Sequence, residues 1–217
     1  MIAKTGSELC LHREGRMSVL PDVAVFDFDR TLTDRDSLLP FLFYMEGRSR
    51  AMGYLASMGL EAMKFIVGWS SRQGLKEKML ARFLGGRSMA EIEAIGRRYA
   101  EEQVDFFLRP QALRRLAWHL SQGHRCLLVS ASPSFYLKPW GKRYGFEAVL
   151  CSHLEVDARG CVTGRLAGLN CWGPEKKRRL LAYLGPREGY RLYAYGDSRG
   201  DREMLGLADY SFYRIFH

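Results

Sequence analysis

The chain has 217 residues, which is enough for one large domain or for a core domain with a smaller insert. Apolar residues make up 47% of it, and this share excludes an intrinsically disordered chain. Lysine and arginine number 33 against 24 acidic residues, and the resulting charge of +9 favours anionic partners such as phosphorylated metabolites, anionic lipid or nucleic acid. The basic residues are scattered, with one dense run over residues 176–179, so we expect a solvated basic surface and no nucleic-acid partner.

Cysteine usage and the first residues suggest a cytoplasmic protein. Five cysteines occur without any CxxC pair, and their spacing matches no common zinc arrangement, so we expect reduced thiols. The first twenty residues contain no apolar run of the kind that a signal peptide needs. Residues 1–21 are predicted as a leader. Because Met17 lies six residues before the first strand, residues 1–16 are either a disordered segment or the product of a misplaced start.

The first predicted element is a buried strand over residues 23–26, which breaks abruptly into Asp27, Phe28 and Asp29. An apolar, β-branched run bounded by polar residues is typical of a strand inside a parallel sheet. Open α/β sheets bind ligands at the carboxyl ends of their strands, which is where the two aspartates fall. Carboxylates two residues apart repel each other, and a divalent cation or a held proton relieves that repulsion. We therefore predict a metal-assisted phosphoryl-transfer site on Asp27 and Asp29.

An all-helical cap is predicted over residues 38–108, with a break at residues 47–50 and a helix running from Ser88 to about Leu108. Such an insert excludes water from the chemistry beneath it. Residues 51–69 are mostly apolar, but a membrane span needs about 20 mainly apolar residues. This stretch carries two charges and three glycines, so we predict a buried helix pair. Contact of this basic protein with an anionic membrane surface stays open.

Strands and helices alternate after residue 109, which predicts a parallel α/β sheet with right-handed crossovers. We therefore assign residues 22–37 and 109–217 to the core and residues 38–108 to the cap. The predicted core elements are a helix over 110–123, a strand over 126–129, a helix ending near 144, a strand over 146–154, a hairpin over 156–166, a helix from 173, a strand over 190–195 and a helix from about 202.

Three of the predicted strands end in polar residues, namely Asp27 and Asp29, Ser130, and Asp197 with Asp201. In a parallel sheet these ends lie at one edge, so the side chains can converge although they are about a hundred positions apart. Carboxylates are hard oxygen ligands that suit Mg²⁺. A serine hydroxyl and the amides beside it can bind phosphoryl oxygens, and a lysine from the helix before the last strand would neutralise charge in the transition state.

In order and spacing, these residues resemble the four motifs of the haloacid dehalogenase-like superfamily of phosphatases. The motifs are Asp27-Phe-Asp-Arg-Thr-Leu-Thr, the strand ending in Ser130, a lysine at Lys176, and Gly196-Asp-Ser-Arg-Gly-Asp201. The resemblance covers residues 23–212 and implies a Rossmann-like parallel sheet with a helical cap after the first strand. The helical insert is similar to that of the phosphoserine-phosphatase-like branch. The runs Ser130-Ala-Ser-Pro133 and 170–176 resemble bacterial phosphatidylglycerophosphate phosphatase relatives.

The resemblance implies a covalent route with Mg²⁺ as the cofactor. Asp27 would attack phosphorus and become an aspartyl phosphate. Asp29 would protonate the leaving oxygen and then deprotonate the hydrolytic water. The implied metal ligands are the carboxylates of Asp27 and Asp197 and the main-chain carbonyl of Asp29.

The resemblance also implies residues that bind phosphate and residues that support them. Those implied to bind the phosphoryl group are Ser130, Ala131 and Lys176, with Thr31 and Asp201 in supporting roles. Alternatives stay open at three of these positions. Ser130 is otherwise a turn former, Lys177 competes with its neighbour Lys176, and Asp201 is otherwise a cap of the following helix.

Two positions depart from the family pattern. Arg30 stands where the family usually has glycine, and Asp36 stands where its phosphoserine enzymes carry glutamate, so both are candidate substrate-side residues. We predict a Mg²⁺-dependent phosphatase acting on a small phosphorylated metabolite. The alternatives are a lipid head-group phosphate such as phosphatidylglycerophosphate, phosphoserine, and a non-catalytic binding protein on the same fold. The sequence does not indicate the ester or the oligomeric state.

Overall fold

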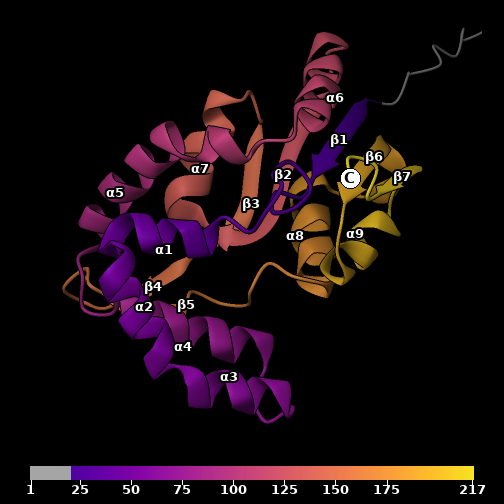
Figure 1. Ribbon diagram of the computed structural model, residues 1–217. Coiled ribbons are helices and arrows are strands. Elements are labelled where there is room, and N and C mark those ends of the chain that lie inside the picture. Colours follow the sequence, from indigo (N-terminus) through magenta and orange to yellow (C-terminus); the bar gives the residue numbers. More distant parts are fainter. Residues whose placement is uncertain (1–20) are drawn as a thin grey trace, which may run out of the picture.

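An open parallel sheet lies at the centre of the computed structural model, which describes residues 21–217 (Figure 1). Residues 1–20, which hold nearly all of the predicted leader, lie outside the described residues. All five strands run parallel in the order β3-β2-β1-β6-β7, and this confirms the predicted fold class. The strands are β1 (Asp22–Phe26), β2 (Arg125–Pro133), β3 (Ala148–Ser152), β6 (Arg191–Gly196) and β7 (Tyr210–Tyr213), of which β7 is absent from the sequence prediction.

Helices cover both faces of the sheet. Alternate residues of β1 belong to two separate apolar clusters, Ala24 and Phe26 on one face and Val23 and Val25 on the other. Because both faces are covered, β1 reads as an unbroken apolar run. The helices are α6 (Pro110–Ser121) and α7 (Ser134–Arg143) on the first face, and α8 (Pro174–Leu184) and α9 (Arg202–Leu205) on the second.

A helical insert follows β1, as the sequence predicts (Figure 1). The predicted break at residues 47–50 is narrower than expected, because Gly47 alone, at φ 75°, separates the first two helices. The helix expected to reach Leu108 ends at Glu102 and is followed by a short 3-10 turn. The elements are α1 (Leu38–Glu46), α2 (Arg48–Ser57), α3 (Gly59–Ile66), α4 (Arg72–Leu84), α5 (Met89–Glu102) and η1 (Val104–Phe107).

The structure confirms a helix pair over residues 51–69, but the prediction that this pair is buried is wrong. Within this stretch α2 buries only Ala51, and α3 buries no residue at all. The apolar composition suggests burial, but α3 lies at the outer edge of the insert, where its main contacts are with α4 and α2 (Figure 1). Within residues 21–217, no helix has the length and apolar character required to cross a bilayer.

A small antiparallel hairpin, β4 (Leu154–Val156) with β5 (Val162–Leu166), connects the cap to the core. The N–H of Val162 donates to the carbonyl of Arg87 at 2.8 Å, and the N–H of Leu166 donates to Glu77 Oε1 at 3.1 Å. Gly164, at φ 90°, allows β5 to lie directly on α4, because a Cβ at this position would fall 2.3 Å from the Cα of Ala81. The hairpin therefore attaches the cap to the core, in addition to the chain connections of the insert and the packing of α5 on α7.

The variant Gly164→Ala is expected to lower the free energy of unfolding by about 2 to 5 kcal/mol, because a left-handed backbone and an overlap with α4 both oppose the new methyl group. Gly160 is a matched control, since it has φ 76° with no atom within 4 Å of a Cβ. Gly160→Ala therefore bears the backbone cost alone. Urea unfolding of both variants measures the difference, and equal losses would contradict the close packing of β5 on α4.

Candidate active site

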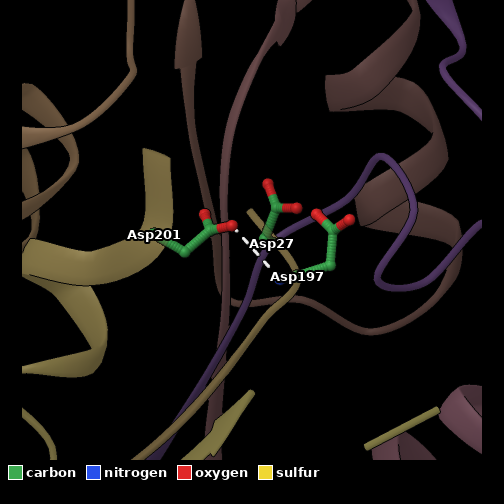
Figure 2. A group of neighbouring side chains, drawn as sticks. All are labelled: Asp27, Asp197 and Asp201. Atoms are coloured by element: carbon green, nitrogen blue, oxygen red, sulfur yellow. Dashed lines mark hydrogen bonds between the residues drawn. The ribbon is translucent and has the colours of Figure 1, made fainter. Parts of the chain in front are cut away.

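Three carboxyl groups gather where β1 and β6 end (Figure 2). Asp27 follows β1 directly, Asp197 follows β6, and Asp201 closes the 3-10 turn η3 (Arg199–Asp201). One oxygen atom from each carboxyl group lies within 4.8 Å of the other two. Because β1 and β6 are adjacent parallel strands at the point where the strand order reverses, their ends form the crevice in which such sheets bind ligands.

Lys176 lies between two of these carboxylates. Its Nζ donates to Asp27 Oδ1 at 2.5 Å and to Asp201 Oδ1 at 2.6 Å, and its side chain is only 2% exposed. Lys177, the other candidate, is exposed, so Lys176 is the lysine beside Asp27. Burial disfavours the ammonium charge, but the two carboxylates outweigh burial and hold the pKa of Lys176 above its ordinary value.

The Asp27 carboxyl is held at both oxygens. Lys176 donates to one, and the Thr31 hydroxyl donates to the other at 3.0 Å. Burial raises the pKa of Asp27 to about 8; Lys176 opposes this rise, and the charges of Asp201 and Asp29 add to it. A cation bound beside this group would favour its ionised form.

The donor set fits the Mg²⁺ that the sequence implies. Among the described residues, the buried Asp197 carboxylate accepts no hydrogen bond; only its main chain is paired, by an N–H donating to Asp201 Oδ2 at 3.2 Å and a carbonyl accepting from Arg214 Nε at 2.8 Å. Burial raises the pKa of Asp197, and Asp201 adds to the rise. Buried carboxylate oxygens without hydrogen-bond donors are suitable ligands for a hard divalent cation.

Asp29 lies outside the group of three carboxylates and has its own partners. Its Oδ1 accepts from the N–H of Ser37 at 2.7 Å, and its Oδ2 accepts from the Ser132 hydroxyl. Burial raises the pKa of Asp29 to about 6, the nearby Asp36 charge adds to the rise, and the two serine hydrogen bonds oppose it. A carboxyl group that titrates near neutral pH can both give and take a proton.

A hydroxyl network behind Asp29 is missing from the sequence prediction. The Ser37 hydroxyl lies 3.3 Å from that of Ser132 and 3.0 Å from that of Tyr136, and Tyr99 of α5 donates to the Ser37 carbonyl at 2.8 Å. The network therefore combines core residues with a cap helix. Ser132 carries one sequence signal, because it lies two positions after the candidate Ser130 at the end of a strand.

Ser130 lies inside β2, which continues to Pro133 through a register shift and does not stop at residue 129. The Ser130 hydroxyl accepts from the N–H of Ser132 at 3.0 Å, so it shapes the chain next to Asp29. The carbonyl of Ala131 accepts from Nζ of Lys76, a cap residue of α4, at 2.5 Å. Burial lowers the pKa of Lys76 to about 8, and the negative charges of Asp29 and Asp36 oppose this decrease.

The structure shows the local geometry of the two residues that depart from the family pattern. Arg30 has φ 63°, in the left-handed region where glycine is the ordinary residue, and its N–H donates to Thr33 Oγ1 at 3.0 Å. Asp36 caps α1, because its Oδ1 accepts from the N–H groups of Leu38 and Leu39 at 3.0 and 3.2 Å. Arg30 and Asp36 are exposed and line the cavity over Asp27, so both stay candidate substrate-side residues.

Two adjoining cavities meet beside Asp29. The first, of about 400 Å³, is polar and contains Asp27, Ser130 and Lys176. The second, of about 370 Å³, extends under the cap and is mainly apolar. Asp29 and Ala131 border both, so the cavities adjoin at these residues. Cations missing from the sequence prediction line the first cavity, namely Arg72, Arg199 and Arg214; the apolar residues of the second are Leu38, Leu39, Leu55, Phe65, Leu75 and Met79.

Comparisons with known proteins agree with this geometry. The family model for haloacid dehalogenase-like hydrolases matches residues 24–206. Protein CicA of Caulobacter vibrioides is 36% identical over 203 residues, covering 93% of this chain and 90% of that protein. Phosphoserine phosphatase SerB1 of Mycobacterium tuberculosis is 30% identical over 202 residues, covering 87% of this chain and 63% of that protein. A solved structure of a Bordetella pertussis protein of unknown function has a TM-score of 0.73 at 25% identity, covering 87% of each chain.

The variant Ser132→Ala is expected to raise the pKa of Asp29 above about 6 by on the order of one pH unit, because the lost hydroxyl stabilises the ionised carboxylate. The pKa of Asp29 in the folded protein already exceeds the ordinary value of 3.8. Deprotonation of Asp29 therefore lowers the stability of the fold as the pH rises from 3.8 to about 6. The part of the stability loss that comes from this pKa change should therefore be present at pH 7 and absent below about pH 4.

Carbon-13 NMR titration of the aspartate carboxyl groups measures this pKa directly. Ser121→Ala, which removes an exposed serine hydroxyl on α6, is the control and should leave Asp29 unchanged. An unaltered Asp29 titration in Ser132→Ala would contradict the assigned hydrogen bond.

Proposed function

We propose that this chain, which belongs to the haloacid dehalogenase-like hydrolase family, is a Mg²⁺-dependent phosphomonoester hydrolase with a small phosphorylated substrate. One observation carries this proposal. Asp27 is oriented by Lys176 and Thr31, and Asp29, with a pKa near neutrality, borders the same cavity. The 30% identity to a protein named phosphoserine phosphatase supports phosphatase chemistry over other hydrolase reactions.

In the proposed reaction an oxygen of Asp27 attacks phosphorus, and the bond from phosphorus to the leaving oxygen breaks. Protonated Asp29 gives its proton to that leaving oxygen, which departs as an alcohol. The resulting Asp29 carboxylate then takes a proton from a water molecule that attacks the aspartyl phosphate. This second step releases inorganic phosphate and restores Asp27. Lys176 and the Ser130 hydroxyl would bind the phosphoryl oxygens during both steps.

We assign the metal to the carboxylates of Asp27 and Asp197 and the main-chain carbonyl of Asp29. When bound, Mg²⁺ would offset the negative charge shared by the nucleophile and the phosphoryl group. Asp201 supports this arrangement from behind, because it holds Lys176 with one oxygen while its other oxygen accepts from Ser198.

A second candidate substrate is a phosphate ester with an apolar leaving group, such as a lipid head-group phosphate. The observation that favours it is the apolar cavity that opens beside Asp29 under the cap. Phosphoserine is less favoured, because Asp36 already caps α1 through its carboxylate. Similarity to phosphatidylglycerophosphate phosphatases stays a prediction, as does contact with an anionic membrane. A non-catalytic role rests on Arg30 alone, and the arrangement of Asp27 with Lys176 argues against it.

The variant Asp27→Asn is expected to reduce hydrolysis of p-nitrophenyl phosphate by on the order of 10³-fold or more, because the amide cannot act as the nucleophile. The assay is run with and without Mg²⁺, and activity should require the metal. Asp34→Asn is the control, since Asp34 is an exposed aspartate of the same loop paired with Arg35. An undiminished rate in Asp27→Asn would rule out this residue as the nucleophile.

Alkyl phosphates of increasing chain length separate the two candidate substrates. If the apolar cavity binds the leaving group, each buried methylene should raise kcat/KM by about fourfold, from roughly 0.8 kcal/mol per methylene, until the cavity is full. Methyl phosphate and phosphoserine provide the polar references. Equal kcat/KM across the alkyl series, with phosphoserine preferred, would favour the small polar metabolite.

A further inference from the structure

The short helix α3 has its apolar side turned to solvent. Leu60, Met63, Ile66 and Val67 recur at the three- and four-residue spacing of one helix face, and Trp69 follows in the next turn. We call these five residues the α3 face. The side chains of Leu60, Ile66 and Trp69 are 69%, 73% and 83% exposed. A contiguous apolar surface of this kind marks a contact site more often than single exposed apolar residues do.

The polar residues of α3 are turned the other way, toward the protein. Glu61 accepts from Lys64 at 3.0 Å and is also paired with Lys78 of the neighbouring helix α4. A surface helix normally buries its apolar stripe and exposes its charges. In α3 this order is reversed. Its one carboxylate, that of Glu61, pairs with Lys78 of α4, and its apolar stripe is left exposed to a partner.

Charge around the α3 face indicates the nature of that partner. Residues 48–84, which form α2 to α4, hold seven lysines and arginines against two glutamates. Arg72 and Lys76 line the cavities of the site, and the exposed cations outside them are Arg48, Arg50, Lys78 and Arg82. An apolar helix face beside an excess of cations is the pattern of helices that lie in the interface of anionic lipid. A second copy of this chain would bring the same excess of cations to the contact, and like charges would oppose that pairing.

The same two helices also reach the interior. Leu55 of α2 and Phe65 of α3 line the apolar cavity beside Asp29, while their neighbours in sequence form the outer surface. Phe65 and Ile66 are consecutive residues of one helix, so the cavity and the α3 face lie on two sides of a single element. A membrane surface bound at the α3 face would therefore lie next to the apolar cavity beside Asp29.

We propose that the α3 face docks this protein on an anionic lipid bilayer, with Leu60, Ile66 and Trp69 entering the interface and the exposed basic residues of α2 and α4 outside the cavities contacting the lipid head groups. The apolar side chains supply affinity in proportion to the area they bury, and the cations add an attraction that salt weakens. This docking goes beyond the proposed phosphatase activity and does not depend on it.

The test is co-sedimentation of the full chain with vesicles of equal parts phosphatidylglycerol and phosphatidylcholine, beside vesicles of phosphatidylcholine alone. The wild type should bind the anionic vesicles at low salt and bind the neutral ones more weakly. The double variant Ile66→Gln/Trp69→Gln should partition into the anionic vesicles at least about tenfold less, because two apolar side chains are lost. Phe106→Gln is the matched control, since Phe106 is 78% exposed on η1 outside the α3 face; it should bind as the wild type does.

Two results would overturn the proposal: a wild type that stays unbound with anionic vesicles, or a double variant that binds as well as the wild type. A dimer in analytical ultracentrifugation that the double variant abolishes, with no vesicle binding, would assign the α3 face to a second copy.

Hydrolysis of soluble p-nitrophenyl phosphate is measured on the same samples and should be equal in all three proteins. Vesicle binding without hydrolysis would contradict the proposed phosphatase and leave the docking intact. Hydrolysis without vesicle binding would contradict the docking and leave the proposed phosphatase intact, so the two failures are distinguishable.

Discussion

The site depends on the placement of one buried lysine between two buried aspartates. In the part of the chain that the structure describes, Lys176 is the only cation hydrogen-bonded to the side chains of this cluster, whereas Asp27, Asp197 and Asp201 are all buried. One cation cannot balance three carboxylates, and uncompensated charge in a protein interior costs several kcal/mol. The raised pKa values of Asp27 and Asp197 express this imbalance. A proton or a divalent cation relieves it, so the interior charge balance itself favours a metal at these strand ends.

Close backbone packing keeps these charges together. A Cβ on Gly196 would lie 2.6 Å from that of Asp201, and a Cβ on Gly200 would lie 2.2 Å from the Trp172 indole nitrogen. Neither glycine has a positive φ, so both are required by space and not by backbone conformation. The turn after β6 is thus folded tightly enough for Asp201 to cap it through Ser198 and hold Lys176 at the same time. Of the two roles that the sequence leaves open for Asp201, the structure favours the contact with Lys176, because the Asp201 side chain makes no capping hydrogen bond to the following helix α9.

The convergence of the strand ends could be predicted from the sequence, because apolar runs that stop at carboxylates follow directly from the burial of a parallel sheet. The lysine beside Asp27 is harder to predict. Lys176 and Lys177 are neighbours in α8 and differ only in the direction in which their side chains leave the helix. The edge strand β7 carries no clear signal, because its four residues are mostly exposed and its pairing is set entirely by β6. The exposure of α3 was unpredictable for a related reason, because it depends on which helices lie next to it and not on its own composition.

The cap contributes to the chemistry through burial as much as through contact. Burial is the largest influence on the pKa of both Asp27 and Asp29, and part of the cover over Asp29 comes from the cap. Tyr99 donates to the Ser37 carbonyl and Lys76 donates to the Ala131 carbonyl, so two cap helices hold the core segments that flank Asp29. Moving the cap away would admit water, and the pKa of Asp29 would fall toward that of an ordinary aspartate. With the cap in place, a larger fraction of Asp29 therefore carries a proton near neutral pH than an ordinary aspartate would.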